Sequence, residues 1–181
     1  ATVNLAAARG EIAGFQLALE TLGGPLADIK VSVVGLDGVT AKLWRTWFVK
    51  IKDTWQGDYA IPMKDALSIP AADNKVDGQK AGVVAVDLIV SPSAKPGEQN
   101  GTVTVSVAGG DARATVQLKL RLKVYGATIP PEIHFNPELN AYSGPGEAGS
   151  EQWFDSHRLA HYHRCSINRV THSHGGRTSA D

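Results

Sequence analysis

The clearest pattern in this chain is Val116-Gln117-Leu118-Lys119-Leu120-Arg121-Leu122-Lys123-Val124. Apolar and polar side chains alternate along the whole stretch, as they do in a strand with one face in the core and the other in water. The sequence therefore predicts a half-buried strand here. Its two lysines and its arginine are then the wet face of that strand, and not a patch that binds nucleic acid.

A second alternating stretch precedes the first. It reads Thr102-Val103-Thr104-Val105-Ser106-Val107, and Gly109-Gly110-Asp111 between the two stretches supplies turn residues that tolerate positive φ. We expect the pair to form an antiparallel hairpin. Proline cannot donate a ladder hydrogen bond, so Lys95-Pro96-Gly97 and Ile129-Pro130-Pro131 mark the limits of the pairing.

The other predicted strands are separated by turn residues. Residues 1–20 predict two strands with a turn at Arg9-Gly10, and further strands are expected over 29–34, 42–52 and 81–90, the last of them central. The segment 53–80 shows no sustained period and is expected to be irregular. This succession predicts a mainly β fold, an antiparallel β-sandwich.

Composition excludes several function classes. The 181 residues include 18 lysines and arginines and 18 aspartates and glutamates, so no net charge favours nucleic acid or an acidic membrane. The longest apolar run is strand-sized, well short of a transmembrane helix. We expect no nucleic-acid partner, no membrane insertion and no cofactor, and the sequence leaves the oligomeric state open.

Two features bear on the compartment. Cys165 is the only cysteine, which excludes an intramolecular disulfide but fits both the cytoplasm and a bacterial cell exterior. The chain begins with Ala1 and enters strand-like sequence at once, so we expect that an upstream segment was cleaved or left out. Our expectation is a secreted, periplasmic or cell-surface protein.

The composition changes after Pro131, and all six histidines lie between His134 and His174. A strand over 133–142, a helix that begins near 150 and a strand over 165–171 would form a β-α-β unit.

We therefore divide the chain into a β-sandwich domain, residues 1–131, and the incomplete start of an α/β barrel domain, residues 132–181. The fold class predicted for the whole chain is an antiparallel β-sandwich followed by the first βαβ portion of a (β/α) barrel.

Three segments carry a family pattern: Arg9-Gly10-Glu11-Ile12-Ala13-Gly14-Phe15-Gln16-Leu17, Asp65-Ala66-Leu67-Ser68-Ile69-Pro70 and Lys95-Pro96-Gly97-Glu98-Gln99-Asn100-Gly101-Thr102-Val103-Thr104-Val105. They resemble the N-terminal sandwich of glycoside hydrolase family 123, the β-N-acetylgalactosaminidase group with its uncharacterised relatives. In that group the sandwich ends near a Leu-Pro, here Ile129-Pro130, and passes into a catalytic (β/α) barrel. Leu159-Ala160-His161-Tyr162-His163-Arg164 resembles the end of the first barrel helix.

The resemblance implies hydrolysis of a β-linked N-acetylhexosamine in a glycan substrate. The substrate's own acetamido group is then the nucleophile, and an adjacent Asp-Glu pair orients it and protonates the leaving oxygen, an exception to the usual two-carboxylate scheme. No Asp-Glu dipeptide occurs in this sequence, and a complete barrel takes about 250 residues. The catalytic residues are therefore unknown, we expect them outside this chain, and we expect the chain alone to be inactive.

A rival hypothesis comes from another class of protein. The chain would be a non-catalytic β-sandwich module that binds polysaccharide or mediates assembly at a cell surface, with the histidine-rich tail as an adaptor. The two hypotheses differ in whether further βα units follow Asp181.

Candidate substrate-binding residues follow from the barrel hypothesis. Side chains at the C-terminal ends of barrel strands reach the active-site face, and here these are Asn140, Tyr142, His172 and His174. The two histidines would hydrogen-bond sugar hydroxyls, and the tyrosine would do the same or stack on a ring. The alternative is that all four are ordinary polar loop residues.

A metal site is a second hypothesis for the histidines, although we expect none. His157 and His161 are four residues apart, on one face of a helix, and His172 with His174 would complete a tetrahedral set. In a barrel, however, the helix begins at the bottom face and the strands end at the top, so the two pairs would be held apart.

Four aromatic residues are candidates for a sugar-stacking platform: Trp44, Trp47, Trp55 and Tyr59. For Trp44 and Trp47 we predict core packing instead, because large aromatic side chains dominate core energetics. Trp55 and Tyr59 fall in the polar segment that follows, where exposure is expected.

Overall fold

The computed structural model describes residues 1–110, 114–130, 138–139 and 166–167. The chain divides into two compact units, Ala1–Ile129 and Pro130–Asp181. Within the described ranges the regular structure is all β, and no helix there has the length and apolar character needed to span a membrane.

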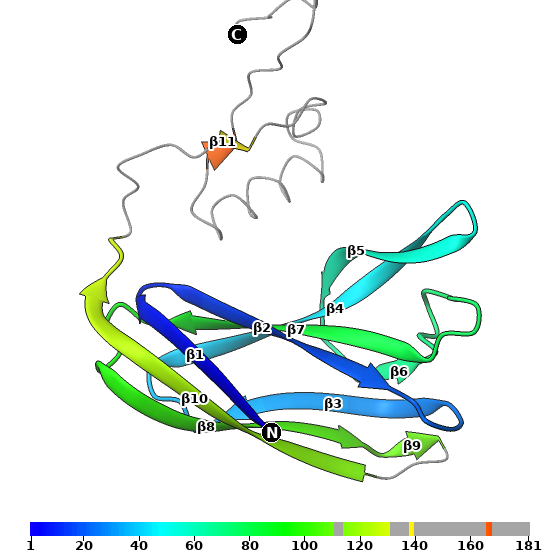
Figure 1. The fold of residues 1–181 in the computed structure, drawn as a ribbon, viewed down its shortest axis with the longest axis horizontal. Helices are drawn as coiled ribbons and strands as arrows, with labels where there is room; N and C mark the ends of the chain where they lie inside the picture. Colours follow the sequence, from blue (N-terminus) through cyan, green and yellow to red (C-terminus); the bar gives the residue numbers. More distant parts are fainter. Residues whose placement is uncertain (111–113, 131–137, 140–165, 168–181) are drawn as a thin grey trace, which may run out of the picture. The chain divides into compact units, whose positions relative to one another are not determined.

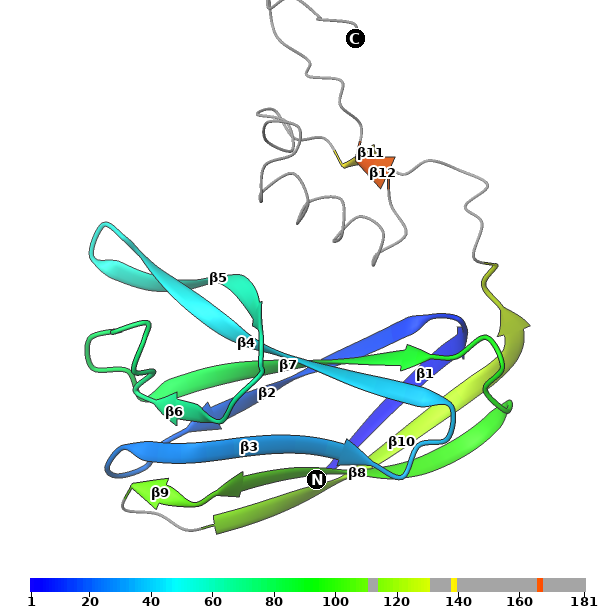
Figure 2. The ribbon, with the colours of Figure 1, turned by 180° about the vertical axis from the view of Figure 1, so that it is seen from behind.

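The first unit contains two sheets (Figures 1 and 2). The larger is built from β1 (Thr2–Arg9), β3 (Leu26–Val34), β6 (Leu67–Ile69), β8 (Gly97–Val107), β9 (Gly109–Gly110) and β10 (Ala114–Thr128), in the order β1-β10-β8-β3-β6 with β9 also on β3. The smaller is built from β2 (Ile12–Glu20), β4 (Val39–Ile51), β5 (Thr54–Pro62) and β7 (Ala81–Val90), in the order β2-β7-β4-β5.

Both sheets contribute to one hydrophobic core. The larger sheet supplies Ile29, Val31, Val103, Val105 and Leu120, and the smaller supplies Leu17, Val84, Val86 and Leu88. These are alternate residues of their strands, as expected where one face of each strand points inward. Two sheets that share a core in this way have the arrangement of a β-sandwich.

The predicted hairpin is confirmed. β8 and β10 pair antiparallel from Val107 opposite Ala114 to Gly97 opposite Val124. Leu120, Leu122 and Val124 are buried, and the alternating Lys119, Arg121 and Lys123 are exposed. Val116 departs from the pattern with 54% exposure, because the core that covers β10 reaches only as far as Leu118.

The predicted turn of the hairpin needs a correction. Gly109–Gly110 form the short strand β9, which pairs with Leu26 and Ala27 of β3. A Cβ at Gly109 would lie 2.9 Å from a carboxylate oxygen of Asp28 and 3.2 Å from the Cβ of Ala27, so glycine permits this close pairing. Residue Asp111 of the predicted turn lies outside the described residues.

The first strand corrects the expectation of a purely antiparallel sandwich. β1 runs parallel to β10, with Val3 opposite Leu120 and Leu5 opposite Leu122. The turn predicted at Arg9-Gly10 is present, and Gly10 there has a φ of 78° that suits glycine. Because β2 belongs to the smaller sheet, this turn carries the chain from one sheet to the other.

The prediction that 53–80 is irregular is wrong, since the segment contains β5 and β6. β5 pairs with β4 from Ile51 opposite Thr54 to Trp44 opposite Pro62. Most of its side chains are exposed, on both faces of the strand. The register of its pairing with β4 shifts between Tyr59, which is opposite Trp47, and Gly57, which is opposite Phe48. A strand that is exposed to solvent on both faces and contains a bulge shows no alternation of apolar and polar residues in its sequence.

The described part of the second unit consists of β11 (Glu138–Leu139) and β12 (Ser166–Ile167), which pair in parallel. They fall within the two strands predicted for this region, and parallel pairing is what a β-α-β unit requires. The predicted helix between them lies outside the described residues, so the barrel start stays a prediction.

Candidate functional site

The candidate residues of the tail lie outside the described residues, and their roles stay predictions: Asn140, Tyr142, His157, His161, His172 and His174. Within the ranges that the structure does describe, no three His, Cys, Asp or Glu side chains are grouped as a metal site. The site that can be built from described side chains lies elsewhere, on the β4–β5 hairpin of the sandwich.

This hairpin extends beyond the rest of its sheet, as Figures 1 and 2 show. Only the part of β4 from Val39 to Arg45 pairs with β7, and the part from Thr46 to Ile51 pairs with β5 alone among the described strands. The outer half of β4 therefore has one edge that no strand of the described residues covers.

Asn74 occupies that edge. Its Nδ2 donates to the carbonyl oxygen of Phe48 at 2.8 Å, and the Phe48 amide donates to its Oδ1 at 2.7 Å. The carboxamide thus pairs with Phe48 much as a peptide of a neighbouring strand would. The side chain is buried, with 8% exposure, and it fixes the loop 70–80 against the hairpin.

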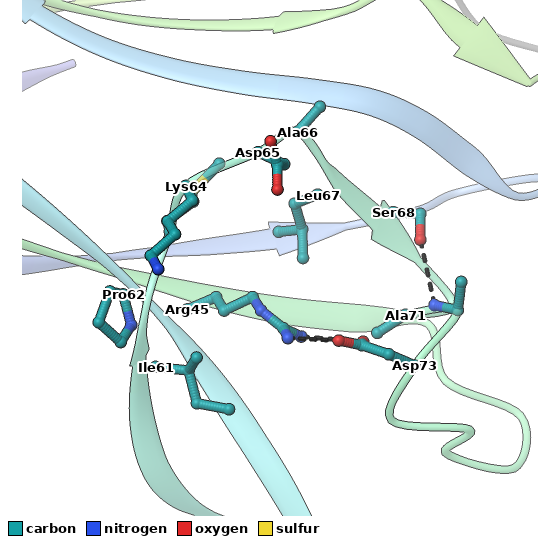
Figure 3. A pocket seen from close by; sticks show the side chains of 12 residues that line it. Arg45, Ile61, Pro62, Lys64, Asp65, Ala66, Leu67, Ser68, Ala71 and Asp73 are labelled. Carbon is teal, nitrogen blue, oxygen red and sulfur yellow. Dashed lines mark hydrogen bonds and ion pairs between the residues drawn. The ribbon is translucent and has the colours of Figure 1, made fainter.

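A cavity of about 460 Å³ opens beside this junction (Figure 3). Its walls come from β4, from the end of β5 and the following turn, from β6 and from the start of the loop 70–80: Arg45, Ile61, Pro62, Met63, Lys64, Asp65, Ala66, Leu67, Ser68, Ala71, Ala72 and Asp73. Ligand sites typically have volumes of about 300–1,000 Å³, so the cavity is large enough for a small molecule.

An ion pair lies in the wall of the cavity. Arg45 Nη1 donates to Asp73 Oδ1 at 3.0 Å, and Nη2 donates to Oδ2 in the parallel bond of a bidentate pair. The hydrogen bond from Arg45 holds the pKa of the Asp73 carboxyl below its ordinary value, so the pair stays charged. The Arg45 guanidinium also lies over the Trp47 ring, with Cζ 5.3 Å from the ring centroid.

Side chains of the loop hold the remaining wall in place. The Ala71 amide donates to Gln79 Oε1 at 2.8 Å, while Gln79 Nε2 donates to the carbonyl oxygen of Ala81 at 2.8 Å. The Ala72 amide donates to Ser68 Oγ at 3.3 Å. The loop between β6 and β7 is thus tied at both ends.

The four aromatic candidates do not form one platform. Trp47 and Tyr59 are register partners and share the face of the hairpin that carries Arg45 and Ile61. Trp44 lies on the other face, as does Trp55, which pairs with Lys50. Tyr59 is 60% exposed, as expected, whereas Trp55 is half-buried.

The prediction of core packing for Trp44 and Trp47 is wrong, because both are only half-buried and neither belongs to the core. Trp44 has a structural contact nonetheless, since its Nε1 donates to Asp87 Oδ2 at 2.8 Å. Asp87 is the one charged residue in the central strand β7. On its other side lies Gly14, where a Cβ would come within 3.1 Å of Asp87 Oδ1.

Sequence reasoning missed two contacts: the Arg45–Asp73 ion pair and the pair of hydrogen bonds between Asn74 and Phe48, which we call the Asn74 clamp. Arg45 is separated from Asp73 by 28 positions, and Phe48 from Asn74 by 26. No spacing rule relates such distant residues, and the only available signal was the run of polar residues after Pro70, which is typical of an exposed loop.

The comparisons with known proteins give a structural likeness. No protein-family model and no curated protein matches the sequence. A family 123 glycoside hydrolase from Clostridium perfringens, studied for glycolipid glycan hydrolysis, matches 72% of this chain with a TM-score of 0.56 and 14% identity. The chain spans 24% of that hydrolase's length. At this identity the likeness shows the fold alone.

Two further solved structures are less similar. Amebosin is 14% identical over 67% of this chain and 87% of its own, with a TM-score of 0.34. AvmM, which catalyses macrocyclization in alchivemycin A biosynthesis, is 11% identical over 72% of this chain and 87% of its own, also with a TM-score of 0.34. Such values carry no argument about this chain.

Proposed function

We propose that this chain is the N-terminal part of a glycoside hydrolase that acts on glycans containing β-linked N-acetylhexosamine. In this proposal the sandwich supports a catalytic (β/α) barrel, and residues 132–181 begin that barrel. The observation that carries the proposal is the likeness of the sandwich to the clostridial family 123 hydrolase over 72% of this chain.

The three family-like segments support the same relationship. They fall where the backbone makes special demands: at Gly10 and Gly97, which have φ angles of 78° and 130°, and at Gly101, where a Cβ would lie 2.7 Å from the carbonyl oxygen of Val34. The segment 65–70 includes β6 and lines the cavity. These glycines are therefore ones that the backbone of a sandwich of this kind requires.

The proposed chemistry requires an adjacent Asp-Glu pair, and no Asp-Glu dipeptide occurs in this sequence. A substrate-assisted reaction uses the acetamido oxygen of the substrate as nucleophile and a carboxylate pair to orient it and to protonate the leaving oxygen. Such a pair would have to lie in the natural protein beyond residue 181. Asn140, Tyr142, His172 and His174 remain the proposed sugar-binding residues of the barrel, and His174→Ala in the full-length protein should weaken substrate binding.

The proposal is tested on the natural full-length protein. Its intact mass should exceed the 19.2 kDa of this chain by about 25 kDa or more, enough for the rest of a barrel. It should release nitrophenol from p-nitrophenyl N-acetyl-β-galactosaminide or N-acetyl-β-glucosaminide, and not from p-nitrophenyl β-galactoside, which lacks the acetamido nucleophile. Equal turnover of all three glycosides would rule out the substrate-assisted reaction.

A glycan-binding module without catalysis is the second candidate function. The observation in its favour is the exposed Tyr59 on the hairpin face that continues from the Arg45–Asp73 cavity. A natural protein that binds polysaccharide but hydrolyses none of these glycosides would favour it. Either function is consistent with the secreted, periplasmic or cell-surface location that we propose, which the N-terminal sequence of the mature protein would test.

A further inference from the structure

The charge of the cavity restricts the class of ligand. Four charged side chains line it, the cations Arg45 and Lys64 and the anions Asp65 and Asp73. Their sum is zero, so the cavity attracts neither a phosphate nor a metal cation over its opposite. Arg45 and Asp73, moreover, already neutralise each other. A neutral ligand is therefore the one that these charges favour.

The Arg45–Asp73 pair offers both kinds of hydrogen-bonding group. The guanidinium has five N–H donors, of which two serve the ion pair, and the Asp73 carboxylate is an acceptor only, which Arg45 shares with the backbone amides of Asp73 and Asn74. The Asp73 side chain is 57% exposed and so can receive a ligand. A hydroxyl group both donates and accepts, and adjacent hydroxyls of a sugar match a neighbouring donor and acceptor that are held in one plane.

Apart from Lys64, Asp65 and Ser68, the rest of the wall is apolar. Leu67 and Ala71 are buried, and Ile61 and Met63 are half-buried beside them, which suits the C–H face of a pyranose ring or the methyl group of an acetamide. The bonds of Asn74 and Gln79 hold the loop in place before any ligand arrives. A site that is already ordered loses less conformational entropy on binding.

An exposed aromatic ring continues the same face. Tyr59 lies two residues from Ile61 along β5 and therefore on the same side, about 7 Å away along the strand. That separation is close to the length of one sugar unit in a chain. A second unit would therefore reach the ring of Tyr59, which lies on the core-facing side of the sheet but is 60% exposed because the hairpin extends beyond the core.

We propose that the cavity between Arg45, Leu67 and Asp73 binds one neutral sugar unit of a glycan and that Tyr59 stacks on the adjacent unit. That this glycan is also the hydrolase substrate rests on the proposed function. The sugar site itself does not, because it is argued from described side chains of the sandwich.

The test is a titration of the ¹⁵N-labelled 181-residue chain, followed by NMR. The probes are methyl N-acetyl-β-glucosaminide, di-N-acetylchitobiose, methyl β-galactoside and inorganic phosphate. The amides of Ser68, Ala72 and Asp73 should shift with the sugars, with a Kd on the order of 1 mM for a single unit. The disaccharide should bind at least fivefold more tightly than the monosaccharide, whereas phosphate should leave these amides unchanged.

Two variants and one control separate the parts of the site. Asp73→Asn removes the bidentate pair and should weaken both sugars about tenfold. Asp77→Asn removes a second ion pair at the hairpin, in which Lys50 Nζ lies 3.8 Å from Asp77 Oδ2, and should change neither affinity. Tyr59→Ala should remove the advantage of the disaccharide and leave the monosaccharide unaffected.

Several results would overturn the proposal: no shifts at 50 mM sugar, shifts with phosphate as large as those with sugar, or equal losses in Asp73→Asn and Asp77→Asn. The titration is independent of hydrolysis. Sugar binding by this chain together with no glycosidase activity in the natural protein would overturn the proposed function and keep the sugar site. Glycosidase activity in the natural protein together with no sugar binding by this chain would support the proposed function and overturn the sugar site.

Discussion

The clamp at Asn74 gives the most specific stability prediction. Asn74→Ala removes both hydrogen bonds to Phe48 and leaves a half-buried amide and carbonyl at the edge of β4 without their partner. An orphaned buried group costs about 1–3 kcal/mol, and water reaches this edge in part. We therefore expect a loss of about 2–3 kcal/mol in the free energy of unfolding, which corresponds to a fall in Tm of roughly 6–10 °C.

The measurement is thermal and urea unfolding followed by tryptophan fluorescence, which reports on the hairpin through Trp47. Asn100→Ala is the matched control, because that side chain is exposed in β8, and it should stay within about 0.5 kcal/mol of the parent. Asn74→Asp keeps the acceptor for the Phe48 amide but sets a carboxylate oxygen against the Phe48 carbonyl. Its deficit relative to the parent should shrink at acid pH, where the protonated carboxyl can donate. A loss below 0.5 kcal/mol in Asn74→Ala would refute the argument, since it would mean that water replaces the clamp at no cost.

Three further predictions concern the sandwich. Leu120→Ala should cost about 3 kcal/mol because the side chain is fully buried, whereas Val116→Ala in the same strand, at 54% exposure, should cost less than about 0.5 kcal/mol; similar losses in urea unfolding would contradict the burial pattern. Gly101→Ala should cost about 2 kcal/mol through the contact at 2.7 Å with the Val34 carbonyl, whereas Gly126→Ala, which has nothing within 4 Å, should be near neutral by the same measurement. Because Arg45 lowers the pKa of Asp73, the pair's contribution is complete above the unfolded-chain pKa of about 3.9 and is lost as the pH falls through the lower folded-state pKa. Asp73→Asn should therefore lower the free energy of unfolding by about 0.5 kcal/mol at pH 7, and below pH 4 the variant should lose stability less steeply than the parent. The same pH dependence of the free energy of unfolding in both proteins would argue against a contribution from the ion pair.

The strands that sequence reasoning found are those with one face on the core. β10, β8 and β7 each have alternating or continuous apolar residues where they pack against the opposite sheet, so their sequences indicate which residues are buried. β5 has no such face and could not be found in this way. The parallel pairing of β1 was missed for a different reason, because alternation tells which side chains point inward but not which strand lies alongside.

The candidate site was less predictable than the fold. The exposure of Tyr59 followed from its polar surroundings, but its place opposite Trp47, on the face that carries Arg45, depends on a register that the bulge in β5 sets. The division of the aromatics between two faces depends on the same register. Charged and amide side chains that meet across a loop leave no periodic trace in the sequence, which is why Asp73 and Asn74 emerge only from the three-dimensional arrangement.

The extension of the β4–β5 hairpin beyond the core links stability to the proposed sugar site. The outer half of β4 gains little from the core, and its uncovered edge is satisfied by Asn74, the residue that follows Asp73. The contact that stabilises the hairpin therefore also holds the acceptor of the sugar site in place. Asn74→Ala should then weaken sugar binding at temperatures where the variant is fully folded, whereas Leu120→Ala, which costs as much stability, should leave the Kd unchanged. Equal affinities in both variants would mean that Asp73 keeps its position through Arg45 alone.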